Sequence, residues 1–315
     1  MKQQLVSAIA AALAFAACEE PPKKSTSVMP MPKSVVVVAK VAPVIPDLKP
    51  DSGVPLVKAE APVLVDALTL AHETPGVDHL ARAKELMGER DFGGALTEAR
   101  RALFSSPTDA ETLELVAKLG RQAGQPSLSA EAFRRIAEQR STDAVPTIKQ
   151  ARALLQAKDF TGAIAAGREA ARRDPGNPEA FQVTGLAQLS SGDLLGAITS
   201  FKTVIGLQPD HGYAMNNLGL AYLRANRNDE AVEILEEAVD HLPTVAYVHN
   251  NLGVAYERVG RGDDAKSAYQ EAMDLSPKYV KAKLNAARVA KGTIETDGEP
   301  EAETMSDVPH PMPEP

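Results

Sequence analysis

A period of 34 residues dominates the sequence between residues 76 and 279. A repeat of this length fixes the architecture before any local propensity is considered. One register, interrupted only by Ser141, holds Pro107, Pro175, Pro209, Pro243 and Pro277. A second, interrupted only by Ser129, holds Ala95, Ala163, Ala197, Ala231 and Ala265. A third holds Ala83, Ala117, Ala151, Gly185, Gly219 and Gly253. The period predicts six contiguous units: 76–109, 110–143, 144–177, 178–211, 212–245 and 246–279.

Helix packing explains these registers when each unit is read as two helices. Small residues at positions 8 and 20 of a unit allow its two helices to cross closely. The proline at position 32 lacks a backbone donor and restricts its predecessor, so the second helix ends there. Asn177 and Pro178 suit the start of a first helix, and Asp91, Asp159 and Asp193 suit the N-caps of second helices. Each hairpin then leaves an apolar face that only the next hairpin can cover.

The fifth and sixth units carry the motif of a known family. That motif places Leu-Gly at positions 7 and 8, Tyr at 11, Ala at 20 and Pro at 32. The fifth unit matches it with Leu218, Gly219, Tyr222, Ala231 and Pro243, and the sixth with Leu252, Gly253, Tyr256, Ala265 and Pro277. The chain therefore resembles tetratricopeptide-repeat (TPR) proteins. The resemblance implies an all-α, right-handed superhelical solenoid of six TPR hairpins, with residues 280–292 as a C-terminal capping helix.

The N-terminus reads as an export signal. Lys2 precedes an uncharged apolar run of thirteen residues from Leu5 to Ala17. This run is too short to span a membrane, which takes roughly twenty residues. The sequence Phe15-Ala16-Ala17-Cys18 resembles a bacterial lipoprotein box, which implies a signal peptide over 1–17 and lipidation of Cys18. Glu19, rather than Asp, favours the periplasmic face of the outer membrane. The alternative is cleavage after Ala16 that leaves a soluble periplasmic protein.

Two polar or proline-rich segments flank the repeats. Residues 18–75 contain ten prolines, a density that opposes helices and central strands, and we predict a disordered stalk there. Residues 293–315 contain seven acidic residues and no Lys or Arg, so we predict a disordered acidic tail.

The first helices of such a solenoid line its concave groove, where position-6 residues form a row. Here Asn217, Asn251 and Asn285 occupy that position. An Asn side chain offers one acceptor and two donors, so it can hydrogen-bond a peptide backbone. The row resembles the asparagine ladder in the TPR region of O-linked N-acetylglucosamine transferases, which holds extended peptides. The other candidate partner-binding residues are Asn216, Asn250, Tyr213, Tyr247, Arg224 and Arg258. Alternatively, the asparagines only solvate the groove, and the tyrosines and arginines serve packing and helix ends.

Composition and motifs restrict the remaining functions. A net charge of -8 and a pI near 5.4 oppose nucleic-acid binding. The single cysteine rules out a cysteine-based zinc cluster, and the six histidines form no metal-ligand or catalytic motif. We therefore expect no enzyme activity, cofactor, metal or small-molecule substrate. The predicted function is a protein-interaction scaffold in the bacterial envelope that holds a protein or extended peptide, with a weak resemblance to pilotin-like TPR lipoproteins. The alternative is an accessory TPR subunit of a cell-wall or glycosyltransferase complex.

Overall fold

The computed structural model describes residues 66–71 and 76–290, and within them it has thirteen α-helices and no strand. Cys18, the signal peptide of 1–17, most of the predicted stalk, residues 291–292 of the capping helix and the acidic tail lie outside these residues. No helix of the described part is both long and apolar enough to cross a membrane. The helices are α1 (His79–Gly88), α2 (Phe92–Ser105), α3 (Ala110–Gln122), α4 (Pro126–Gln139), α5 (Val145–Gln156), α6 (Phe160–Arg173), α7 (Pro178–Ser191), α8 (Leu194–Leu207), α9 (Gly212–Arg224), α10 (Asn228–His241), α11 (Ala246–Arg258), α12 (Gly262–Leu275) and α13 (Val280–Ala290).

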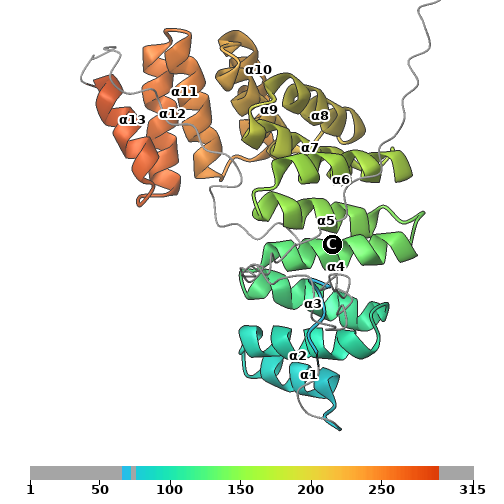
Figure 1. The fold of residues 1–315 in the computed structure, drawn as a ribbon. Coiled ribbons are helices and arrows are strands. Elements are labelled where there is room, and N and C mark those ends of the chain that lie inside the picture. Colours follow the sequence, from blue (N-terminus) through green and yellow to red (C-terminus); the bar gives the residue numbers. More distant parts are fainter. Residues whose placement is uncertain (1–65, 72–75, 291–315) are drawn as a thin grey trace, which may run out of the picture. The chain divides into compact units, whose positions relative to one another are not determined.

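The helices form hairpins that stack in one row (Figure 1). Each helix packs against the next in the chain, from α1 to α13. The first helices α5, α7, α9, α11 and α13 also contact one another in sequence, so they form a continuous layer. The predicted all-α solenoid of helical hairpins is confirmed.

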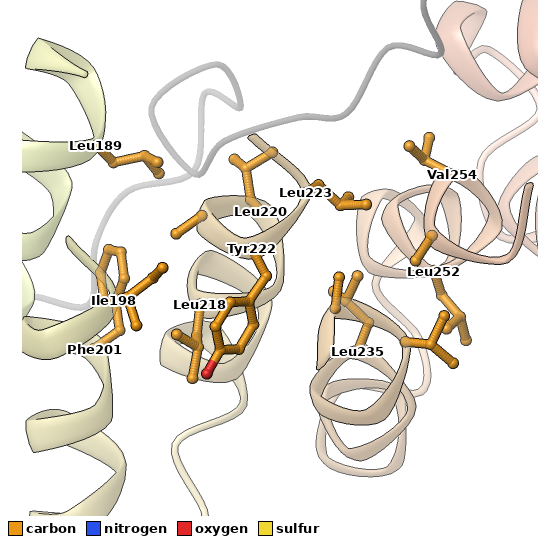
Figure 2. Close-up of a cluster of buried hydrophobic side chains, with 14 of the residues drawn as sticks. Leu189, Ile198, Phe201, Leu218, Leu220, Tyr222, Leu223, Leu235, Leu252 and Val254 are labelled. Atoms are coloured by element: carbon orange, nitrogen blue, oxygen red, sulfur yellow. The ribbon is translucent and has the colours of Figure 1, made fainter. Parts of the chain in front are cut away.

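The glycine at position 8 makes room for a large side chain from the second helix. A Cβ added to Gly185 would lie 2.7 Å from an atom of Phe201, and one added to Gly219 would lie 2.4 Å from an atom of Leu235. Both partners occupy position 24, a position that the sequence analysis did not single out. Figure 2 shows Phe201 and Leu235 within the apolar layer between successive hairpins.

The turn inside every hairpin has one residue in the left-handed region, always at position 15. Glycine supplies it at Gly124, Gly192 and Gly260. In the other three units Arg90, Lys158 and Asn226 adopt φ values of 65°, 60° and 57°. Left-handed backbone suits glycine best. Because three non-glycine residues adopt it at the same position, we infer that the packing of the two helices sets the turn geometry.

Helix starts follow the predicted caps. The side chains of Asp91, Asp159 and Asp193 each accept a hydrogen bond from a backbone N–H in the first turn of α2, α6 and α8. Asn177 caps α7, and Pro178 is its first residue. The caps predicted from the sequence are thus confirmed.

Residues 66–71, here called the N-terminal strap, pack on the first two hairpins. Leu68 is fully buried in their core cluster. Arg100 of α2 donates from Nη2 to the carbonyl of Ala67 at 3.0 Å, and its own carbonyl accepts from Leu70 N–H at 3.1 Å. Asp66 pairs with Arg135 of α4. Partial burial opposes ionisation of Asp66, but the hydrogen bond from Arg135 holds its pKa below the ordinary value. The predicted stalk boundary at residue 75 is corrected, because these residues belong to the folded part.

The last helix, α13, is held by a polar cluster. Glu257 of α11 pairs with Arg288 of α13, and Tyr269 of α12 donates its hydroxyl to Glu257 Oε2 at 2.9 Å. Burial of Tyr269, reinforced by the charge of Glu257, raises the pKa of this phenol. The outer face of α13 stays open, with Val280 and Leu284 62 % and 61 % exposed.

Candidate protein-binding site

The predicted asparagines lie in the layer of first helices and bind one another across hairpins. Asn251 Nδ2 donates to Asn216 Oδ1 at 2.9 Å, and Asn285 Nδ2 donates to Asn250 Oδ1 at 3.0 Å. Each bond joins position 6 of one unit to position 5 of the unit before. All of these asparagines, with Asn217, are at most 3 % exposed. The ladder is therefore a set of buried links between hairpins, which the sequence did not predict; partner binding by it stays a prediction.

Gln182 is a member of this row that the sequence analysis missed. It occupies position 5 of the fourth unit, on α7, and α7 contacts α9, which carries Asn216 and Asn217. Its side chain is only 5 % exposed, and neither Nε2 nor Oε1 has a hydrogen-bond partner among the described residues. Asn216 Nδ2 likewise has no partner there. We call Gln182, Asn216, Asn217, Asn250, Asn251 and Asn285 the amide row.

Unsatisfied buried amides are costly, which makes Gln182 informative. Leaving such a group without a partner costs about 1–3 kcal/mol. Native proteins retain few of these groups, and an ordered water or a bound ligand can supply the missing donor and acceptor. The signal in the sequence is the shared position 5 of Gln182, Asn216 and Asn250, one place before the asparagines at position 6.

The predicted tyrosines lie at the packed end of the first helices. Tyr247 is 5 % exposed and belongs to a buried cluster with Met215 and Val248. Tyr213 is partly buried against the same cluster. Both rings therefore contribute packing between the last two hairpins, and a role in partner binding stays a prediction.

The predicted arginines bind carbonyl groups at helix ends. Arg224 Nη1 donates to the carbonyl of Leu189 at 3.2 Å, and Arg258 Nη1 donates to that of Leu223 at 2.7 Å. Each acceptor lies in the last turn of the preceding first helix, where carbonyls lack intrahelical partners. These contacts tie successive first helices together.

Three histidines in the described part make structural contacts. His79 Nδ1 lies 2.6 Å from Glu98 Oε2, His211 accepts from Ala214 N–H at the start of α9, and His249 Nε2 lies 2.8 Å from the carbonyl of Pro243. Across residues 66–71 and 76–290, no group of three or more His, Cys, Asp or Glu side chains could hold a metal ion.

Comparison with known protein families identifies the type of repeat. A tetratricopeptide-repeat family model matches residues 80–144, 148–178 and 183–246, and a second one matches residues 246–279. No curated protein sequence matches the chain.

Solved structures share the fold. PilW, described as a widely conserved type IV pilus biogenesis factor, is 16 % identical with a TM-score of 0.53, over 67 % of this chain and 96 % of its own. MamA from Desulfovibrio magneticus RS-1 is 20 % identical with a TM-score of 0.50, over 54 % of this chain and 96 % of its own. These identities show the fold alone. The family models, however, cover more than half of the chain, and the protein belongs to the tetratricopeptide-repeat family.

Proposed function

We propose that the protein is a non-enzymatic interaction scaffold that holds an extended segment of a partner protein along the amide row. The observation that carries this proposal is Gln182, whose amide is buried without a partner among the described residues, so that rotation of this side chain into the groove would present its donor and acceptor to a partner. An extended backbone exposes both N–H and C=O groups, and a primary amide complements both. The row would bind a backbone without selecting its side chains.

Replacing Gln182 by leucine tests this role. An apolar side chain of similar size removes the unsatisfied group, so the free energy of unfolding should be unchanged or about 1 kcal/mol higher. Partner binding should fall about tenfold, the effect of losing roughly 1.4 kcal/mol. The measurement is quantitative crosslinking with mass spectrometry in the native host, alongside urea unfolding of the purified protein.

The matched control is Gln270→Leu on α12, where the glutamine is exposed and bonds Asp274. It should leave the crosslinked partners unchanged. Undiminished recovery of the same partners by a folded Gln182→Leu variant would exclude the amide row as their binding site.

We further propose that the scaffold is exported and anchored by a lipid on Cys18, at the periplasmic face of the outer membrane, where it supports assembly of an envelope complex. The lipoprotein-type sequence before Glu19 supports this location. Several acyl chains would give durable anchoring, because each buried CH₂ contributes about 0.8 kcal/mol.

Cys18→Ser tests the anchor. Labelled palmitate should be incorporated into the wild-type protein and lost in the variant, because serine offers no thiol for acylation. The variant should also leave the membrane fraction, whereas Glu19→Gln should keep the label. A wild-type protein that takes up no palmitate would favour the soluble periplasmic alternative.

A further inference from the structure

The N-terminal strap shows how the outer side of two hairpins binds an extended segment. Leu68 is fully buried, and the flanking backbone is held by Arg100 on α2. On the other side, Asp66 pairs with Arg135 on α4. The strap therefore crosses from α4 to α2 with one leucine as its apolar anchor.

A cavity of about 410 Å³ lies at the equivalent place two units later, among α6, α7 and α8. Two periods amount to 68 residues, and this offset takes Arg100 to Arg168 and Arg135 to Thr203. Arg168 and Thr203 both line the cavity. By the same offset, Leu103, which shares a core cluster with Leu68, corresponds to Ala171, and Ala171 also lines the cavity. The cavity therefore corresponds to the strap's site.

Among residues 66–71 and 76–290, no segment covers the second site as the strap covers the first. Leu113, in the core beneath the strap, is fully buried, whereas its equivalent, Phe181, is only partly buried and lines the cavity. Leu195 at the cavity is 73 % exposed. Arg168 keeps the guanidinium that Arg100 uses to hold a backbone carbonyl, and it is exposed. The second site thus retains both the hollow and the arginine, and no strap from the described part of the chain fills it.

We propose that this cavity binds an extended, leucine-bearing segment of a partner protein. The leucine side chain enters the hollow beside Ala171, Phe181 and Leu195, and Arg168 donates to the carbonyl of the residue before it, as Arg100 does to Ala67. Thr203 replaces Arg135, so an acidic residue two places before the leucine is not selected. The site lies mainly on second helices, away from the amide row on the first helices. It is thus independent of the function proposed above.

A peptide with the strap's own sequence, residues 65–71 (VDALTLA), is the probe. Labelled with fluorescein, it should bind the full chain saturably in anisotropy titrations. Leu68→Ala in the peptide should weaken binding at least tenfold, because a buried leucine contributes most of the apolar contact. Asp66→Asn in the peptide should change it less than twofold. Absence of saturable binding up to millimolar protein would overturn the proposal.

Variants of the protein locate the peptide. Arg168→Ala, which removes the anchor, and Thr199→Trp, which fills the cavity, should each weaken binding about tenfold. Arg172→Ala, one turn later on α6 with its side chain 75 % exposed, is the matched control and should change binding less than twofold. Circular dichroism confirms that each variant is folded. Binding as tight as that of the wild type in both cavity variants would overturn the proposal. So would a loss confined to Arg100→Ala, since the peptide would then be replacing the strap.

Discussion

Replacing Phe201 by alanine should lower the free energy of unfolding by about 3–5 kcal/mol, the usual range for removing a buried aromatic ring. Phe201 is fully buried, and its ring lies over Gly185 in the space between the two helices of the fourth hairpin. Urea unfolding followed by circular dichroism measures the change. Leu195→Ala on the same helix, where the leucine is 73 % exposed, should change stability by no more than about 0.5 kcal/mol.

Gly185, which lies against the Phe201 ring, allows a second test of the same contact. Gly185→Ala alone should cost about 1–3 kcal/mol, because the new Cβ would lie 2.7 Å from the Phe201 ring. In the double variant the smaller residue at 201 leaves room for that Cβ. The combined cost should therefore be less than the sum of the two single costs. Additive costs would show that positions 8 and 24 do not share this space.

Replacing Glu257 by glutamine should release the last helix. Arg288 and Glu257 are 21 % and 16 % exposed, so loss of the carboxylate leaves the guanidinium poorly compensated and weakens the bond from Tyr269. Removing one partner of a buried pair costs about 3–5 kcal/mol, and partial exposure reduces this to about 2–3 kcal/mol. Hydrogen exchange should show faster exchange in α13 than in α11.

Glu237→Gln is the control for this experiment, because Glu237 lies exposed on α10. It should leave the exchange of α13 unchanged. Equal protection of α13 in Glu257→Gln and wild type would mean that Ala282 and the other apolar contacts hold the helix without the ion pair.

The repeat made the fold predictable because each signal is local. A proline ends a helix and an aspartate caps one through neighbouring backbone atoms, so Asp159 could be assigned from the sequence alone. The contact between Gly185 and Phe201 could not, because it joins different helices and depends on how they cross. The strap was missed for a related reason. Nearby prolines suggested an extended segment, and nothing local shows that Leu68 meets the core of another element.

The candidate site was only partly predictable. Asparagines at position 6 were visible as a pattern, but the bond from Asn251 to Asn216 joins residues 35 apart on different helices. Gln182 differs from the asparagines in type, and only its burial without partners distinguishes it. The sequence thus identified the helices that carry the candidate site. The structure was needed to distinguish amides that link two hairpins from an amide that has no partner among the described residues.

The exposed face of α13 is a surface on which the array of hairpins could be extended. This helix continues the register of a first helix, and its residues Val280 and Leu284 are exposed. Leu284 holds position 5, where Asn216 and Asn250 meet the next first helix. Within the described residues the solenoid thus ends on the first half of a seventh repeat. A further helix packed on this face would extend the array with no rearrangement of the hairpins already in place.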